Sequence, residues 1–288
     1  STSWASLSVP FVARRSERRL CDRCGIRGGA GAPLGRILCS MSARWYVEAF
    51  RGDYRRVYAH RDLAAARREV RWLAEEVLAG VEGPVLDDCC GFGRHSLALA
   101  EAGFDVFGID LSFDLLASSG TMEGAEKRLS GRLCQADMRA LPFSGDSFAA
   151  VVNLFTSFGY LGDEGDGAAL DEMTRVLRPG GSLVMDLMNP AAIRRGLRPS
   201  SREERDGIVL EARRSIEDGG RRVVKEVELT LASGEVRRWR EEVRMYEADE
   251  LDALLAARGL SVVGRAGSFE GEPFDPEQAD RQVVLARS

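Results

Sequence analysis

The chain has 288 residues, of which 44% are hydrophobic and 30% are charged, and its formal net charge is −5. This composition is that of an ordinary globular protein, and the length allows one large α/β domain with an insertion or two small domains. No run of eighteen apolar residues occurs, so we expect no membrane span, and the acidic balance argues against a general nucleic-acid binder.

Residues 1–40 differ in composition from the rest of the chain. They contain seven arginines but only two acidic residues, and they show little helical or strand periodicity. Three interpretations are open: an organelle transit peptide, a disordered basic arm, or an upstream extension ahead of a natural beginning at Met41. We favour disorder or an extension, and we expect this segment to add nothing to the core.

The cysteines raise the question of a metal site. Cys21 and Cys24 form a C-x-x-C pair, and Cys39 could add a third zinc ligand. The only histidines are His60 and His95, so the fourth ligand is missing and we predict no metal site. Because no secretory signal precedes the cysteines, we expect a reducing, cytoplasmic location.

Segment 41–191 has the pattern of an α/β core. It opens with two amphipathic helices, 43–58 and 62–80. Short apolar strands then alternate with helices, which predicts a parallel sheet covered by helices on both faces. The predicted strands are 83–89, 105–110, 131–137, 147–155 and 182–189, and the helices between them are 94–103, 113–129 and 167–181.

After this core the pattern changes from alternating helices and strands to strands alone. Three strand-like runs, 207–217, 221–232 and 235–246, are joined by the turn sequences DGG and SGE. They predict an antiparallel three-stranded insertion over 192–246, which could form a lid over an acceptor pocket or a homodimer surface. Segment 247–288 returns to a helix and two strands, which we expect to complete the core sheet.

A glycine turn follows the first predicted strand. Gly91 and Gly93 lie just past that strand, where the missing side chain lets a ligand approach the backbone. Asp110 ends the next strand, and a carboxylate there can accept hydrogen bonds from both hydroxyls of a ribose. This pattern predicts an adenosine-type ligand, although taken alone it also fits a nicotinamide-dependent dehydrogenase.

Three further positions favour a ligand other than a dinucleotide. Asp87 precedes the glycines, where a carboxylate would repel a pyrophosphate but can accept a hydrogen bond from an amino group. Asp137 ends the third strand and is placed to accept from an adenine amino group. Ser96 stands where the dinucleotide motif has its third glycine.

At these residues the chain resembles the class I S-adenosylmethionine-dependent methyltransferases of the bacterial small-molecule type. The matching blocks, in order, are VLDDCCGFGRHS, VFGIDLS, CQADMRALPF, FAAVVNLFTSFGYL and RVLRPGGSLVMDLMNP. The resemblance covers about 41–288. It implies a Rossmann-like seven-stranded sheet, with six parallel strands and an antiparallel last strand, and S-adenosyl-L-methionine as the cofactor.

The resemblance also implies a set of cofactor-binding residues. Asp87 should meet the methionine amino group, Asp110 the ribose, and Asp137 the adenine edge. Cys89 stands where this family most often has glycine, so its Cβ should narrow the approach to the cofactor. The full set is Asp87, Cys89, Gly91, Gly93, Asp110, Leu111, Asp137, Met138 and Asn153.

Methyl transfer is an in-line displacement, so the protein has to hold the acceptor behind the methyl group. No catalytic base is identifiable from the sequence, and the weak candidates are His95 and Tyr160. Trp45, Tyr46 and Phe50 of the first helix either cover the cofactor pocket or pack on the core.

We therefore predict a methyltransferase that acts on an O, N or C atom of a small molecule. Two alternatives are a catalytically silent S-adenosylmethionine-binding regulatory protein and a nicotinamide-dependent oxidoreductase.

Overall fold

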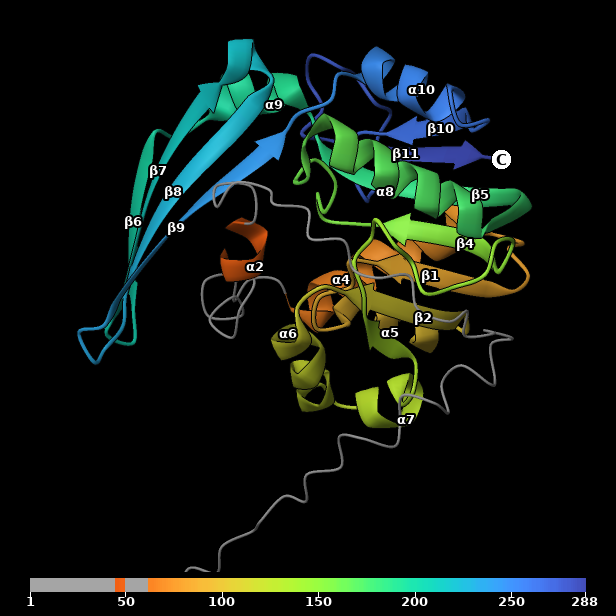
Figure 1. Ribbon diagram of the computed structural model, residues 1–288, viewed down its shortest axis with the longest axis horizontal. Coiled ribbons are helices and arrows are strands. Elements are labelled where there is room, and N and C mark those ends of the chain that lie inside the picture. Colours follow the sequence, from red (N-terminus) through yellow and green to blue (C-terminus); the bar gives the residue numbers. More distant parts are fainter. Residues whose placement is uncertain (1–44, 50–61) are drawn as a thin grey trace, which may run out of the picture. The chain divides into compact units, whose positions relative to one another are not determined.

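The computed structural model describes residues 45–49 and 62–288 (Figure 1). The predictions that concern segment 1–40, with its three cysteines, and those for Phe50 and His60 lie outside these residues. Within the described residues, no helix is long and apolar enough to cross a membrane.

Seven strands form one sheet in the order β10-β11-β5-β4-β1-β2-β3. Within this sheet β11 runs antiparallel to its neighbours and the other six strands are parallel, which confirms the predicted architecture. From β1 the chain proceeds to β2 and β3 on one side of β1, and β4 lies on the other side of β1. The strands are β1 Pro84–Asp88, β2 Asp105–Asp110, β3 Leu133–Gln135, β4 Phe148–Asn153, β5 Leu177–Met188, β10 Ser261–Ala266 and β11 Arg281–Arg287.

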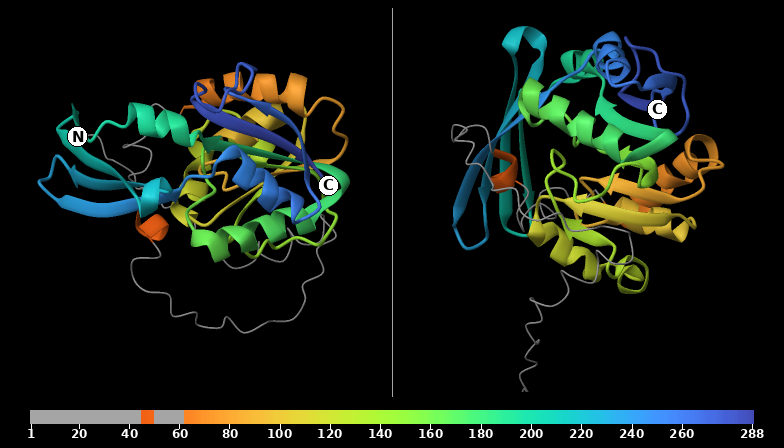
Figure 2. Two further views of the ribbon diagram at one scale, coloured as in Figure 1. Left: turned by 90° about the horizontal axis from the view of Figure 1, so that it is seen from above. Right: turned by 45° about the vertical axis from the view of Figure 1, so that its right-hand side comes forward.

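Helices cover both faces of this sheet (Figures 1 and 2). Helices α4 and α5 pack on one face, and α8 and α10 pack on the other, as their buried residues show. The helices are α2 Trp45–Ala49, α4 Leu63–Trp72, α5 Arg94–Glu101, α6 Phe113–Ala117, α7 Ala125–Leu129, α8 Gly162–Val176, α9 Pro190–Gly196 and α10 Ala248–Ala256. Short helical turns are a π-helical turn Leu73–Val77 and two 3₁₀ turns, Ser118–Thr121 and Asp218–Gly220.

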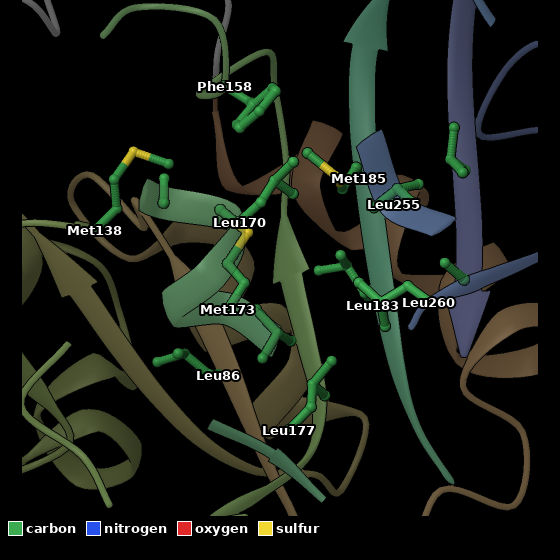
Figure 3. Packing of buried hydrophobic residues seen from close by; sticks show 14 of the residues in the cluster. Leu86, Met138, Phe158, Leu170, Met173, Leu177, Leu183, Met185, Leu255 and Leu260 are labelled. Atoms are coloured by element: carbon green, nitrogen blue, oxygen red, sulfur yellow. The ribbon is translucent and has the colours of Figure 1, made fainter. Parts of the chain in front are cut away.

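The strands supply side chains alternately to two hydrophobic clusters, one on each face of the sheet. Val85 of β1 belongs to the cluster beneath α4 and α5, whereas the next residue, Leu86, belongs to the cluster beneath α8 and α10. Figure 3 shows that second cluster, in which Leu170 and Met173 of α8 lie against Leu183 of β5. All five side chains are essentially inaccessible to solvent, so both faces of the sheet are sealed.

One predicted helix is interrupted in the structure. The sequence predicts a continuous helix over 113–129, but α6 gives way to a 3₁₀ turn and α7 starts separately at Ala125. Gly124 causes the break, because it precedes α7 with a left-handed backbone at φ 82°.

The predicted insertion is a second, antiparallel sheet. It has four strands in the order β6-β7-β8-β9 rather than the three predicted, and these are β6 Ser200–Arg205, β7 Ile208–Glu217, β8 Arg222–Thr230 and β9 Val236–Arg244. The additional strand β6 has the sequence SSREER, which offers no apolar alternation to recognise. It forms by pairing with β7, and charged residues are common on such edge strands.

The second sheet is hydrogen-bonded to the loop that follows β4. The Arg244 N–H at the end of β9 donates to the Gly159 carbonyl at 2.8 Å. Two residues later, the Tyr246 hydroxyl donates to Asp166 of α8, also at 2.8 Å. Gly159 has a φ of 100°, and a Cβ there would lie 2.5 Å from the Arg244 carbonyl oxygen. This close approach therefore requires glycine.

We predict that Gly159→Ala destabilises the protein more than Gly162→Ala. Both glycines have positive φ, but a Cβ at Gly162 meets no atom within 4 Å. Gly162→Ala should cost about 1 kcal/mol for the left-handed backbone, and Gly159→Ala about 2–3 kcal/mol more for the steric overlap. Urea unfolding of both variants measures the difference. Equal losses would show that the contact between β9 and the loop adds nothing to stability.

Candidate active site

A cavity of about 290 Å³ opens at the carboxyl ends of the central strands. Its lining comes from the segments that follow β1, β2, β3 and β4, together with α2. Ligands of open α/β sheets bind at this edge, where the strand order reverses. Of the predicted site residues, the lining includes Asp87, Cys89, Gly91, His95, Asp110, Leu111, Asp137, Met138 and Tyr160.

Asp110 connects two strand ends. Its Oδ2 accepts a hydrogen bond from Gly91 N and its Oδ1 accepts one from Ser112 N, both at 2.8 Å. Burial raises the pKa of Asp110 to about 6, although these two hydrogen bonds lower it. Each carboxylate oxygen keeps a further acceptor position, so both can still bind a ligand hydroxyl.

Asp87 and Asp88 are both buried at the end of β1. Asp87 accepts a hydrogen bond from the Ser96 hydroxyl at 2.6 Å, and burial raises its pKa. The neighbouring Asp88 accepts from Asn153 Nδ2 at 3.1 Å, and burial raises the pKa of Asp88 to about 7. Asn153 does not line the cavity but holds Asp88 beneath it. Asn153 therefore contacts Asp88 and not the cavity that the sequence predicts it to line.

Asp137 is engaged by a side chain that the sequence analysis did not identify. Both oxygens of its carboxylate accept from the Arg139 guanidinium, at 3.0 and 2.6 Å. The hydrogen bond to Asp137 is the main cause of a raised pKa of Arg139, and Tyr46 also hydrogen-bonds to this guanidinium. The carboxylate at the third strand is thus linked to α2.

The two glycines of the turn, Gly91 and Gly93, have different surroundings. Gly91 lines the cavity with φ 61°, and a Cβ there would meet no protein atom within 4 Å, so this space is open to a ligand. A Cβ at Gly93 would instead lie 3.2 Å from Leu133, which makes Gly93 a packing residue rather than a lining one. Gly93 is also the residue that precedes α5, with φ 81°.

Cys89 takes a conformation that suits glycine better than cysteine. Its φ is 64°, in the left-handed region. The Cys89 sulfur lies 3.6 Å from Met138 Sδ, and burial raises the thiol pKa. The thiol is therefore neutral and narrows the cavity beside Met138.

The loop after β4 forms part of the cavity wall. Phe155 and Thr156 both have positive φ, at 63° and 57°. Asp186 of β5 holds this backbone by accepting from Phe155 N at 2.7 Å, and Arg281 of β11 bonds both Asp186 and the Thr156 hydroxyl. The Arg94 guanidinium lies 4.6 Å from the centre of the Phe155 ring. Residues from three distant segments thus fix this loop.

Helix α2 supplies part of the cavity lining. Tyr46 and Val47 line the cavity, and Trp45 packs its ring 5.0 Å from that of Tyr160. Strand β9 packs against α2. Among the described residues the second sheet itself gives no side chain to the cavity, so it acts by supporting α2 and the loop after β4.

His95 is paired with a glutamate from α4. His95 Nε2 lies 2.6 Å from Glu69 Oε2, and Arg94 donates to the same oxygen at 3.1 Å. Burial would raise the pKa of Glu69, but the hydrogen bonds and charges of His95 and Arg94 lower it to about 2. Nothing in the sequence marked Glu69, because it precedes the strands and lies 26 residues from His95. No cluster that could hold a metal ion is found among the described residues.

Comparisons with known proteins indicate a methyltransferase. Residues 85–181 match the model of the methyltransferase domain family. The chain is 29% identical over 215 residues to the cypemycin N-terminal methyltransferase of a Streptomyces species, covering 70% of this chain and 82% of that protein.

Two solved structures share the fold. The CcbJ methyltransferase from Streptomyces caelestis is 23% identical with a TM-score of 0.65, over 77% of this chain and 89% of that one. The SAM-bound amino pentose methyltransferase CalS10 from Micromonospora echinaspora is 25% identical with a TM-score of 0.57, over 81% of this chain and 95% of that one.

A seven-stranded sheet of this order, with acidic residues ending its first three strands around a cavity, defines a Rossmann-like enzyme that binds an adenosine-type cofactor. Residues 85–181 therefore form a methyltransferase domain, and the chain has the fold of the class I S-adenosylmethionine-dependent methyltransferases.

We predict that the protein without ligand loses stability as the pH rises from 5 to 8. The folded-state pKa values of Asp88 and Asp110, about 7 and 6, lie above the ordinary value of 3.8, so the folded state binds more protons in this window. The stabilisation is complete below pH 3.8 and is lost as the pH passes 6 and 7. The opposite effect of Glu69 falls below pH 4.5 and does not interfere.

Asp88→Asn should make this pH dependence smaller and should stabilise the protein at pH 8 by about 1 kcal/mol or more. Urea unfolding at pH 5 and pH 8 measures both effects. Asp105→Asn, at the exposed start of β2, serves as the control. An unchanged pH dependence in Asp88→Asn would contradict the assignment to Asp88.

Proposed function

We propose that this protein transfers a methyl group from S-adenosyl-L-methionine to an amine nitrogen of a small molecule. The cavity bordered by Asp87, Asp110 and Asp137 is the observation that carries this proposal. The names of the similar proteins supply the choice of acceptor, because one is an N-terminal methyltransferase and another an amino pentose methyltransferase.

The residues of the cavity fit the cofactor. Asp110 has two oxygens with acceptor positions left for the ribose hydroxyls, and Gly91 leaves its side-chain space open. Asp87 would accept from the methionine amino group, and Asp137 would accept from the adenine while Arg139 holds it in place. Leu111 and Met138 would provide apolar contacts to the adenine.

When bound, S-adenosyl-L-methionine supplies a methyl group on a positively charged sulfur. Buried carboxylates close to this position favour a cation, so the acidic cavity suits the charged cofactor better than its neutral product. The chain's own part is to orient the acceptor and to exclude water. Phe155, Tyr160 and Tyr46 form aromatic walls suited to this task.

The size of the cavity supports a small acceptor. About 290 Å³ lies just below the usual range for ligand pockets, and S-adenosyl-L-methionine alone would take up this space, so only a compact acceptor group could be placed beside it. The second sheet would contribute by holding α2 and the loop after β4 in place. This role differs from the lid that the sequence suggested, because the sheet would support the cavity wall and would not cover the acceptor itself.

We predict that Asp110→Ala weakens S-adenosyl-L-methionine binding by about 30- to 1000-fold. Two hydrogen bonds to a charged group are lost, at about 2–4 kcal/mol for the pair. The variant should also lose some stability, because Gly91 N and Ser112 N lose their acceptors. Calorimetric titration gives the affinity, and Asp105→Ala, at the other end of β2, is the control. Binding within threefold of the wild type would reject the ribose assignment.

The proposed activity is tested directly with a panel of amines. We expect a mass increase of one methyl group on at least one member of a panel of aminosugars, amino acid amides and short peptides, detected by mass spectrometry. Matched hydroxyl compounds that lack the amine are the control. Cofactor binding without any methylated product would instead favour the silent regulatory protein, and methylation of the hydroxyl compounds would reject the amine acceptor.

A further inference from the structure

Glu69 and His95 form a buried pair beside the cavity. The Glu69 carboxylate comes from α4, and it meets His95 Nε2 at 2.6 Å near the start of α5. The His95 side chain is 6% exposed and that of Glu69 is 18% exposed. Since Glu69 keeps its charge down to about pH 2, it is an acceptor at every working pH. The short distance therefore places a proton on Nε2 of His95.

The other ring nitrogen of His95 is then a proton acceptor. A neutral imidazole carries one N–H and one lone pair, so a proton held at Nε2 leaves the lone pair on Nδ1. In the part of the chain that the structure describes, Nδ1 has no hydrogen-bond partner. His95 lines the cavity, and Nδ1 is the ring nitrogen that its pairing with Glu69 leaves for a ligand there.

The other titratable groups of the cavity are less suited to accept a proton. In the proposed function, Asp87, Asp110 and Asp137 accept hydrogen bonds from the cofactor in addition to those from the protein donors described above. The thiols of Cys89 and Cys90 have raised pKa values, mainly because they are buried, so they remain protonated.

We propose that His95 Nδ1 accepts the proton of an ammonium acceptor, and that Glu69 is the positioning residue that orients the ring and stabilises the imidazolium. This inference rests on the proposed function, because an amine arrives protonated at neutral pH. The N–H bond breaks, the proton passes to Nδ1, and the nitrogen lone pair becomes free. That lone pair forms the new N–C bond as the S–C bond breaks, and the sulfur keeps its electron pair. The proton on His95 then leaves to solvent.

Several charged groups surround the pair and bear on its protonation. Arg94 shares the Glu69 oxygen, and Asp87 of β1 interacts electrostatically with both His95 and Arg94. Arg281 of β11, beside Asp186 of β5, interacts with Glu69 and with Tyr160. These groups are common to the wild type and to each variant below, so the comparison isolates the pair.

The first experiment does not depend on turnover. The chain has two histidines, so His60→Gln leaves His95 as the single imidazole for ¹⁵N NMR. We expect the neutral ring to carry its proton on Nε2, and we expect this preference to weaken in Glu69→Gln, which keeps the hydrogen-bonding shape but loses the charge. A neutral ring with its proton on Nδ1 would overturn the proposal whatever the acceptor is.

The second experiment follows the pH dependence of methyl transfer to the best amine of the panel. At pH 7, His95→Gln should lower kcat about 100-fold or more, as expected for a lost proton acceptor, with little change in cofactor affinity. The loss should shrink towards pH 9, because more of the amine is then already neutral. Glu69→Gln should show a smaller loss with the same trend, and His60→Gln should match the wild type.

The outcomes separate this proposal from the proposed function. A loss in His95→Gln that is equal at pH 7 and pH 9 would mean a structural role and would overturn the proposal. If no amine is methylated by the wild type, the proposed function fails, whereas the NMR measurement still decides whether Nδ1 can accept a proton.

Discussion

The hydrogen bonds of Asp110 hold the site together. This carboxylate ends β2 and accepts from the backbone of Gly91, which follows β1, and from that of Ser112, which begins the next segment. The glycine turn can therefore keep its open shape only while Asp110 is in place. Burial of this carboxylate raises its pKa to about 6. A cation bound nearby would lower this pKa, because it favours the charged form of the carboxylate. The arrangement that prepares the site thus also makes it favour a positively charged ligand.

Much of the fold could be predicted because local patterns and the sheet agree. Apolar runs of about six residues, separated by helical periodicity, predict the core strands, and β2 has the bounds read from the sequence, 105–110. The three aspartates Asp87, Asp110 and Asp137 line one cavity for the same reason, since parallel strands end at one edge of a sheet. Strand β6 was missed because its stability comes from pairing with β7 and not from any pattern of its own.

The contacts that hold His95 and the loop after β4 could not be predicted in the same way. Glu69 and Arg281 lie on α4 and β11, far along the chain from the residues that they contact, and only the folded sheet brings them together. Charged residues are frequent in this sequence, so nothing distinguished these two. The left-handed backbone of Phe155 and Thr156 also escaped prediction, because no glycine occurs there to mark it.

The position of β11 has a consequence for folding during synthesis. This strand is inserted between β5 and β10, and Arg281 bonds Asp186, which lies 95 residues earlier in the chain. While the ribosome makes the intervening second sheet, one edge of β5 has no partner and can pair with other chains. By then the strands around Asp110 have been synthesised, but the loop at Phe155 still lacks the hydrogen bond that Arg281 donates to the Thr156 hydroxyl. The nascent chain therefore passes through a stage in which both the loop after β4 and this edge of the sheet are incomplete.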